Sequence, residues 1–500
     1  MPKRVAVIDI GSNSARVVIY QRTSRFGFHL IFQQKSRVRI GEGAYQKGGN
    51  LQKEGILRAF RALLSFSHSI KEYKVRKVHC VATSALRDAP NKSEFISLVK
   101  KELGIKIRVI DGDKEAFYGA VAAINLLPVK SAITVDIGGG STDMALIQDG
   151  KILKTISLNL GTVRLKELFS DKGELISGGK KFIEKILDTI PKDFKADCVI
   201  GIGGTSRALA KSIMKKENYP FEKIHAFRYK FDKKNRNYLE EIAKSSIKDL
   251  KKFNIKESRF DTIREGSFIL LKLLEYLDAK EVLSSGVGVR EGVFLSDLLR
   301  NSKYKFPPNI NPSIRSIKDR FDILKLPEGN KKQIASKLFE TLKDEFDGSY
   351  KEKDLMQKAL NLSNIGKILT IYKSHQHAFY IASQELNFGF FHEEIIFISL
   401  ILRSRGDSLY YKPLYKKYKD LLPDKKTIKW VCFIYTLSLI LNENSSQAKI
   451  EFEWNQKELK IISNKNIYLA SEEINALEKP KEFKIKLIEP KLDIFDKKEL

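Results

Sequence analysis

Short apolar runs rich in β-branched residues alternate with amphipathic segments through the first 300 residues of the chain. Such runs predict buried strands, and apolar residues at helical spacing predict the helices between them. Strands are expected at 5–10, 16–21, 29–34, 77–83 and 105–110, and helices at 51–73, 91–104 and 113–127. Strands that alternate with helices in this way predict an α/β sheet with crossover connections.

The same pattern starts again at Ser131. Its expected parts are a strand at 132–136, a hairpin at 144–158, a strand, glycine turn and helix at 198–210, a helix at 262–277, a strand at 281–285 and a helix at 286–299. A segment rich in Pro and Asn at 306–313 marks a boundary. Beyond it the pattern predicts one helix after another up to residue 442, and then a small sheet with one helix.

Two glycine turns stand at equivalent points of the two patterns. The sequence DIGSNSAR begins at Asp9 and DIGGGSTD begins at Asp136, a separation of 136 − 9 = 127 residues. A glycine-rich turn directly after a buried strand leaves backbone N–H groups free to point at an anion. One such turn is compatible with a plain hairpin. Two in register predict a duplicated phosphate-binding fold with its ligand between the halves.

The charge balance agrees with an anionic ligand. Lys and Arg number 90 and Asp and Glu number 61, so the formal net charge is +29. A positive field steers polyanions toward a protein, although a generally basic proteome would give the same excess on every surface.

The cysteines and apolar runs point to the cytoplasm. Cys80, Cys198 and Cys432 are far apart, which fits a reducing compartment and excludes a disulfide framework or a thiolate metal site. The N-terminal apolar run is interrupted at Asp9, so no signal peptide is expected. The longest C-terminal apolar run, 430–441, is about half the length that a membrane span needs. We expect a soluble cytoplasmic protein.

Seven stretches in order carry a family resemblance. They are 9–19, 82–91, 109–122, 135–146, 157–169, 201–210 and 286–292. Together they resemble the exopolyphosphatase / guanosine pentaphosphate phosphatase (Ppx/GppA) family, within the larger group of actin-like, sugar-kinase-like and Hsp70-like ATPase folds. The resemblance implies an α/β protein with two duplicated actin-like (ribonuclease H-like) domains at 1–127 and 128–305. An all-α HD-like domain at 314–442 and a small α+β domain at 443–500 would follow.

The resemblance also assigns residues to a phosphate site. The two turns would form a cradle from Gly11, Ser12, Asn13 and Ser14 on one side and Gly138, Gly139, Gly140 and Ser141 on the other. Its rim would be Arg16, Ser84, Arg87, Gly203, Gly204, Thr205 and Arg290. Glycine lets phosphate oxygens approach the backbone, and Arg offers a bidentate fork. Arg259 and Arg264 fit a surface ion pair equally well. On composition alone, a longer phosphate chain would continue over Arg22, Arg25, Lys35, Arg37 and Arg39.

Glu115 matches the family's catalytic glutamate, which would act as the general base for water. Asp111 and Asp113 lie beside it in the first turn of a helix, so the alternative is three acids that complement the helix dipole. Asp143 would be the second catalytic carboxylate and also a metal ligand. The family usually has Glu at this position, and Asp is one methylene shorter.

The cofactor implied by the resemblance is Mg²⁺, with a monovalent cation such as K⁺ as an addition. Asp9, Asp136 and Asp143 would be its carboxylates, because Mg²⁺ prefers oxygen ligands and bridges readily to phosphates. The alternative for Asp9 and Asp136 is a carboxylate that caps the turn after its own strand.

The HD-like region lacks the residues of an HD metal site. Ser363 and Asn364 stand where a His-Asp or His-Glu pair would fall, and 402–407 has no His. His375 and His377 have no acidic partners nearby in sequence. We expect a structural region that covers the cleft and forms a homodimer interface.

The leading functional hypothesis is a Mg²⁺-dependent hydrolase that releases terminal phosphate from polyphosphate, guanosine pentaphosphate or both. An ATP-using kinase-like relative and a non-catalytic regulator that binds alarmone or polyphosphate remain alternatives. A nucleic-acid partner is disfavoured, because no dedicated module is present. The sequence does not choose between the two phosphate substrates.

Overall fold

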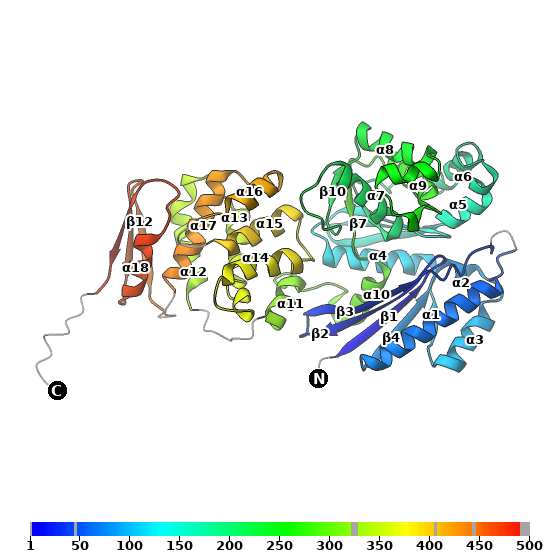
Figure 1. Ribbon diagram of the computed structural model, residues 1–500, viewed down its shortest axis with the longest axis horizontal. Coiled ribbons are helices and arrows are strands. Elements are labelled where there is room, and N and C mark those ends of the chain that lie inside the picture. The colour runs from blue at the N-terminus through cyan, green and yellow to red at the C-terminus, as the bar shows by residue number, and fades with distance from the viewer. Residues whose placement is uncertain (1–2, 45–47, 322–328, 405–407, 443–446, 491–500) are drawn as a thin grey trace, which may run out of the picture. The chain divides into compact units, whose positions relative to one another are not determined.

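The computed structural model describes residues 3–44, 48–321, 329–404, 408–442 and 447–490 (Figure 1). They fall into two compact units, Met1–Pro312 and Ser313–Leu500. Each unit is described by itself.

The first sheet of unit 1 has the strand order β3-β2-β1-β4-β5. Its strands are β1 (Arg4–Ile10), β2 (Ala15–Arg22), β3 (Phe28–Ser36), β4 (Lys77–Ala82) and β5 (Ile107–Val109). The first three strands are antiparallel, and β1, β4 and β5 run parallel. Helices α1 (Lys53–Glu72), α2 (Ser84–Asp88) and α3 (Lys92–Leu103) lie beside this sheet (Figure 1). The short helix α2 was not among the helices expected from the sequence.

The second sheet has the order β10-β11-β9-β6-β7-β8. Its strands are β6 (Ala132–Ile137), β7 (Thr142–Gln148), β8 (Lys151–Leu158), β9 (Cys198–Ile202), β10 (Arg228–Lys230) and β11 (Glu281–Ser284). The pairings β8–β7 and β7–β6 are antiparallel, and the pairings β6–β9 and β9–β11 are parallel. The first sheet has the same sequence of pairings when it is followed from β3 to β5. Helices on this half are α5 (Thr162–Leu168), α6 (Gly178–Leu187), α7 (Gly203–Lys216), α8 (Lys233–Lys244) and α9 (Ile263–Tyr276).

The duplication extends to single residue pairs. Asp9 pairs with Arg16 across β1 and β2, and Asp136 pairs with Asp143 across β6 and β7, so both partners keep the offset of 143 − 16 = 127. A β-bulge interrupts the next pairing between Ile19 and Tyr20 in one half and between Leu146 and Ile147 in the other, again 146 − 19 = 127 apart. A bulge is a specific feature of a strand pair. Its occurrence at the same position in both halves supports the predicted duplicated α/β fold.

Two helices cross between the sheets. Helix α4 (Gly112–Leu126) follows the first sheet but contacts β6, β7 and β8 of the second, and α10 (Val289–Leu298) contacts both α4 and β1 (Figure 1). The crossing is close because a Cβ on Gly292 of α10 would overlap the backbone carbonyl of Tyr118 on α4. On the other side of α10, Tyr20 stacks on Phe294 (4.4 Å between ring centroids) and donates a hydrogen bond to Glu291 Oε1 (2.6 Å).

Unit 2 begins with helices. They are α11 (Pro312–Phe321), α12 (Lys331–Leu342), α13 (Tyr350–Asn361), α14 (Ser374–Glu385), α15 (His392–Arg403), α16 (Lys412–Tyr418) and α17 (Lys425–Ile440). A sheet of order β12-β13-β14 follows, made of β12 (Ile450–Trp454), β13 (Glu458–Ser463) and β14 (Lys484–Ile488), with α18 (Tyr468–Ala476) before the last strand. Phe483 stacks on Trp430 of α17 (5.9 Å), which joins this sheet to the helices.

The likeness of unit 2 to an HD domain stays a prediction. Ser363, one of the residues where a metal pair would fall, accepts a hydrogen bond from the buried Lys331 ammonium (3.1 Å). A fixed positive charge beside this position opposes a metal cation. Residues 405–407 of the stretch 402–407 lie outside the described part of the chain. Among the described helices, none has both the length and the apolar character needed to cross a bilayer.

The close crossing of α4 and α10 predicts a selective loss of stability. Gly292→Ala should lower the free energy of unfolding by about 3 kcal/mol, because the new methyl group meets rigid backbone. The matched variant Gly119→Ala lies on α4, where the methyl group meets only the tip of the Ile202 side chain (3.3 Å). It should change stability by less than about 1 kcal/mol. Urea unfolding of both variants checks this, and equal stabilities would contradict the close crossing.

Candidate active site

The two glycine turns have the same backbone closure. Gly11 N donates to Ser14 O (3.1 Å), and Gly138 N donates to Ser141 O (2.9 Å). The turns also meet each other, because a Cβ on Gly139 would lie 2.8 Å from Ser12 Cβ. Ser12 Oγ and Ser84 Oγ share a hydrogen bond (3.0 Å), which ties the first turn to α2. The predicted cradle is therefore a pair of similar turns in direct contact.

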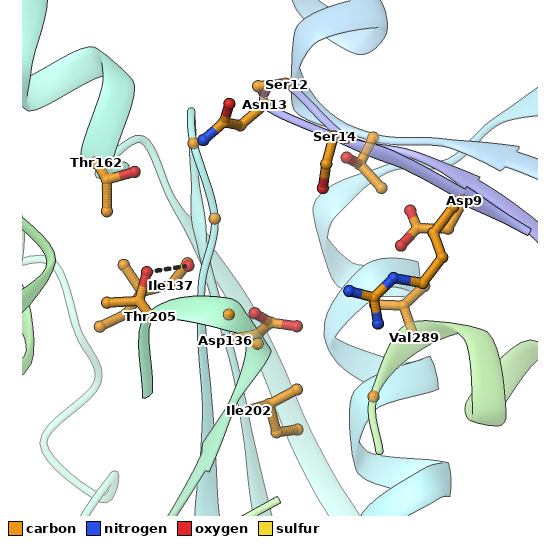
Figure 2. Close-up of a pocket in the computed structure, with 18 of the residues that line it drawn as sticks. Asp9, Ser12, Asn13, Ser14, Asp136, Ile137, Thr162, Ile202, Thr205 and Val289 are labelled. Carbon is orange, nitrogen blue, oxygen red and sulfur yellow. Dashed lines mark hydrogen bonds between the residues drawn. The ribbon is translucent and has the colours of Figure 1, made fainter. Parts of the chain in front are cut away.

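A polar pocket lies between the two halves at these turns (Figure 2). Most residues predicted for the site line it, namely Asp9, Gly11, Ser12, Asn13, Ser14, Arg16, Ser84, Glu115, Asp136, Gly138, Gly139, Ser141, Gly203, Gly204, Thr205 and Arg290. Three predicted residues do not line it, which are Arg87, Gly140 and Asp143. The structure thus brings the two motifs together, whereas the charged groups of Arg87 and Asp143 lie outside the pocket lining.

Three carboxylates face this pocket from different elements. Asp9 and Asp136 are the penultimate residues of β1 and β6, and Glu115 lies in the first turn of α4. Burial raises the pKa of all three, to about 6 for Asp136 and well above its usual range for Glu115. Repulsion among the negative charges adds to this effect. Such carboxylates accept a proton or a cation more readily than exposed ones.

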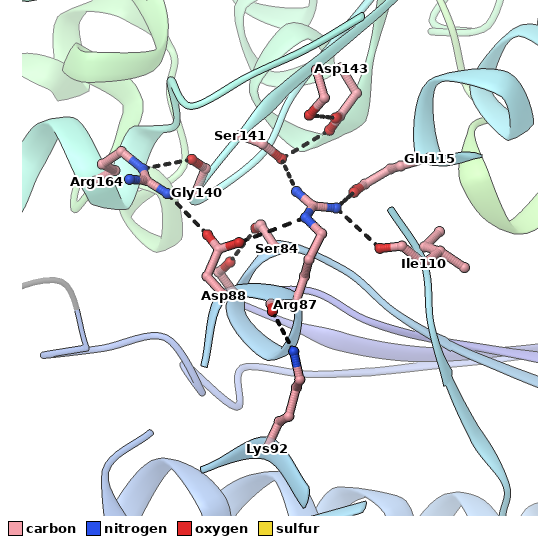
Figure 3. A network of polar contacts seen from close by, with 12 residues as sticks. Ser84, Arg87, Asp88, Lys92, Ile110, Glu115, Gly140, Ser141, Asp143 and Arg164 are labelled. Atoms are coloured by element: carbon pink, nitrogen blue, oxygen red, sulfur yellow. Dashed lines mark hydrogen bonds and ion pairs between the residues drawn. The ribbon is translucent and has the colours of Figure 1, made fainter. Parts of the chain in front are cut away.

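Arg87 holds Glu115 in place (Figure 3). Its Nη1 donates to Glu115 Oε2 (3.2 Å) and to Ile110 O (3.3 Å), and its Nη2 donates to Ser141 Oγ (3.4 Å). The guanidinium opposes the rise in the pKa of Glu115 that burial and Asp143 cause. Sequence reasoning placed Arg87 on phosphate, whereas here it connects α2, α4 and the second glycine turn.

Asp143 lies behind the pocket rather than on its surface. Its Oδ1 accepts a hydrogen bond from Ser157 Oγ (2.5 Å) and its Oδ2 accepts one from Ser141 Oγ (3.0 Å). Burial raises the pKa of Asp143 to about 7, although both serines oppose the rise. The negative charge of Asp143 contributes to the raised pKa of Glu115, so Asp143 acts on the pocket through charge.

The predicted metal ligands do not form a cluster. Within the described ranges, no group of three or more His, Cys, Asp or Glu side chains is arranged to hold a metal ion. Asp9 and Asp136 line one pocket from its two sides, which fits a divalent ion that takes its other ligands from phosphate and water. Asp143 does not share this pocket lining.

The positive lining of the pocket is larger than the rim predicted from the sequence. Lys35, Arg37, Arg207 and Arg259 line the pocket in addition to Arg16 and Arg290. Arg207 could have been predicted, because it lies in the family-like stretch 201–210, one helical turn after Gly203. For Arg259 the sequence left a surface ion pair open, and its guanidinium lies against the backbone of Gly204.

The basic residues proposed for a longer phosphate chain divide between the pocket and the surface outside it. Lys35 and Arg37 enter the pocket, whereas Arg22 and Arg25 do not line it. Arg39 pairs with Asp261 (3.4 Å) and Glu42 (3.5 Å) instead.

The crowded cations act on one another. Burial and neighbouring guanidinium groups lower the pKa of Lys35 to about 8 and those of Arg16 and Arg207 to about 10. Burial works against the charge of Arg290 too, but Glu291 and Asp9 outweigh it and raise the pKa of Arg290. Nη1 of Arg290 is a buried donor without a hydrogen-bond partner within the described residues. An anion with several oxygens would relieve both the repulsion and the unmatched donor.

The comparison with known sequences agrees with this pocket. The sequence profile of the Ppx/GppA phosphatase family matches residues 18–301, which is more than half of the chain. The chain belongs to the Ppx/GppA phosphatase family. The predicted family is therefore confirmed, and the predicted enzyme class, a hydrolase of phosphoanhydride bonds, agrees with it.

Two curated relatives of this Ppx/GppA chain differ in coverage. A bifunctional 3-dehydroquinate synthase/phosphatase of Fusobacterium nucleatum is 32% identical over 301 residues, which cover 56% of this chain and 44% of that protein. The chain thus matches less than half the length of this relative. A guanosine-5'-triphosphate,3'-diphosphate pyrophosphatase of Pseudoalteromonas translucida is 27% identical over 408 residues, 78% of each chain.

Solved structures resemble about three fifths of this chain. The Aquifex aeolicus member of the Ppx/GppA family is 30% identical, covers 60% of this chain and 99% of its own, and gives a TM-score of 0.52. An exopolyphosphatase from Cytophaga hutchinsonii is 25% identical, covers 59% and 98%, and gives a TM-score of 0.51. These matches support the actin-like part of the predicted fold.

The positive lining of this Ppx/GppA pocket predicts which arginines bind an anion. Arg259→Met should weaken the binding of tripolyphosphate about tenfold or more, because a charge-assisted hydrogen bond is lost in a partly buried pocket. Arg25→Met removes the same charge from an exposed residue outside the pocket lining, and should leave the affinity nearly unchanged. Isothermal titration at one fixed salt concentration compares them. Equal losses would mean that only net charge matters.

Proposed function

We propose that this chain hydrolyses the terminal phosphoanhydride bond of inorganic polyphosphate or guanosine pentaphosphate. One observation carries the proposal. A raised-pKa carboxylate, Glu115, lines a pocket between two glycine turns, and six basic side chains line the same pocket. Phosphoryl transfer needs positioning, neutralisation of charge and a group that orients water, and this set of residues suits all three tasks.

The terminal phosphate would rest between the two turns. Backbone N–H groups and the hydroxyls of Ser12 and Ser14 would donate to its oxygens, together with the Arg290 Nη1 that lacks a partner. The remaining phosphates would extend over Arg16, Arg207 and Arg259. Guanidinium groups neutralise the charge that develops on the equatorial and leaving oxygens.

Glu115 would act as the general base. In its ionised form it accepts a proton from a water molecule as the water oxygen attacks the terminal phosphorus and the bond to the bridging oxygen breaks. The products are inorganic phosphate and a chain shorter by one unit. A raised pKa suits this role, since a base works best when its pKa lies near the working pH. The ion pair with Arg87 fixes the direction of the carboxylate.

Asp9 and Asp136 would hold the divalent cation, which we take to be Mg²⁺, and phosphate oxygens and water would complete its shell. When bound, the ion supplies positive charge to the phosphate oxygens. Asp143 would stay behind the wall, fixed by Ser141 and Ser157. A homodimer that works in the cytoplasm, as expected from the sequence, is part of the same proposal.

The base assignment has a direct test. Glu115→Gln should lower phosphate release by at least about 100-fold, because a proton acceptor is lost, while tripolyphosphate binding should change little. Asp113→Asn is the matched control, since Asp113 is an exposed acid in the same helical turn, and it should keep most activity. Release from long-chain polyphosphate and from guanosine pentaphosphate should be followed separately for both variants. Full activity of Glu115→Gln would refute the assignment.

The metal assignment predicts dependence on a divalent ion. Activity should be lost in EDTA and restored by Mg²⁺. Asp136→Asn should raise the Mg²⁺ concentration for half-maximal activity about tenfold or more, because one of two carboxylate ligands is lost. Titration of activity with Mg²⁺ measures this. Undiminished activity in EDTA would contradict the proposed ion.

A further inference from the structure

A buried histidine lies where the two halves of unit 1 meet. His225 is only 7% exposed and belongs to the connection between α7 and β10 in the second half. Its Nε2 lies 2.9 Å from Leu126 O, and its Nδ1 accepts a hydrogen bond from Gly286 N (3.0 Å). A carbonyl oxygen can only accept and a backbone N–H can only donate. The ring is therefore neutral, with its proton on Nε2.

Both of these hydrogen-bond partners of His225 belong to segments that lead to site residues. Leu126 is the last residue of α4, whose first turn holds Glu115. Its carbonyl is one of the helix-end acceptors that lack a partner within the helix. Gly286 lies in the short connection from β11 to α10, which leads to Gly288, Val289 and Arg290 in the pocket lining. One imidazole thus joins the C-terminal end of α4 to the segment that carries Arg290.

The peptide bond at Gly286 is also held from its other end. Ser285 O accepts a hydrogen bond from Nη1 of Arg207 (3.2 Å), and Arg207 lines the pocket. A chain of contacts therefore runs from α4 through His225 and the Ser285–Gly286 peptide to a pocket cation. Ser285 is fully buried, so water does not compete for these bonds.

The residue after His225 has a backbone conformation that is unfavourable for its residue type. Ala226 has φ = 65°, in the left-handed region that residues with a Cβ seldom adopt. Its N–H donates to Ser284 O (2.9 Å), which fixes the chain beside the end of β11. Strain of this kind persists only where the surroundings impose it, and it occurs most often at functional sites. Here it aims the imidazole between the two halves.

We propose that His225 is a positioning residue that sets the place of Glu115 relative to Arg207 and Arg290. The inference rests on the proposed function, because it concerns the same pocket. His225 does not touch the substrate. It fixes the register between α4, which brings the base, and the segment that brings the phosphate-binding arginines.

Three substitutions at His225 distinguish the effects of the hydrogen bonds to Leu126 and Gly286. His225→Asn keeps an acceptor near the Nδ1 position for Gly286, His225→Gln keeps a donor near the Nε2 position for Leu126, and His225→Leu keeps neither. The matched control is Ser267→Ala. It removes a buried hydrogen bond to Leu239 O (2.7 Å) within the same unit, away from the pocket lining.

Hydrogen–deuterium exchange gives a readout that does not depend on activity. We expect faster exchange at 284–290 in His225→Gln, at 120–127 in His225→Asn, and at both in His225→Leu. Ser267→Ala should leave both segments at the wild-type rate. Wild-type exchange at both segments in His225→Leu would overturn the proposal.

Kinetics decide whether the connection positions catalytic groups. With polyphosphate or guanosine pentaphosphate, kcat of His225→Leu should fall about 10- to 100-fold, as expected when reacting groups shift by about 1 Å. Its KM should change less than about threefold, and one of the conservative variants should recover part of kcat. A kcat equal to that of Ser267→Ala, measured well below the unfolding temperature of both, would overturn the positioning role. If the wild-type chain releases no phosphate from either substrate, the proposed function fails, while the exchange result still tests the contacts of His225.

Discussion

The close crossing of α4 and α10 is the constraint on which the rest of unit 1 depends. Gly292 lets the two helix backbones touch, and each helix also contacts strands of the opposite half. The pocket lies between the same two halves, so this crossing sets how far apart its walls stand. A small residue far from any phosphate contact is therefore part of the geometry of the site.

The pocket keeps charges together that would separate in water. Six basic and three acidic side chains share its lining, and neighbouring charges contribute to the shifted pKa values of Lys35 and Asp136. Burial lowers the pKa of Lys35 and raises that of Asp136, so the free site is electrostatically strained in both directions. A multiply charged anion with its cation would satisfy both sets, since it supplies negative charge to the arginines and positive charge to the carboxylates.

The sequence predicted the fold of unit 1 well because its signals are local. Apolar runs, glycine turns and the repeat of 127 residues are all visible along the chain, and they placed Asp9, Asp136 and Glu115 in one pocket. What escaped prediction depends on side-chain direction. The Arg87 side chain points at Glu115, and the Asp143 carboxylate accepts hydrogen bonds from Ser141 and Ser157. Arg259 lines the pocket from a short helical turn that carries no sequence motif. The start of a helix or strand follows from a pattern, whereas the aim of a long side chain follows from tertiary packing.

The pairing of strands at the two turns gives the pocket a polarity. The position opposite Asp9 holds Arg16, whereas the position opposite Asp136 holds Asp143. An exact repeat would have built a two-fold symmetric cleft, in which a linear molecule could lie in either direction with equal energy. Because one half carries a cation where the other carries an acid, the two directions differ in energy. Even a ligand whose two ends are chemically identical, such as the proposed inorganic phosphate chain, would therefore bind with a defined head and tail.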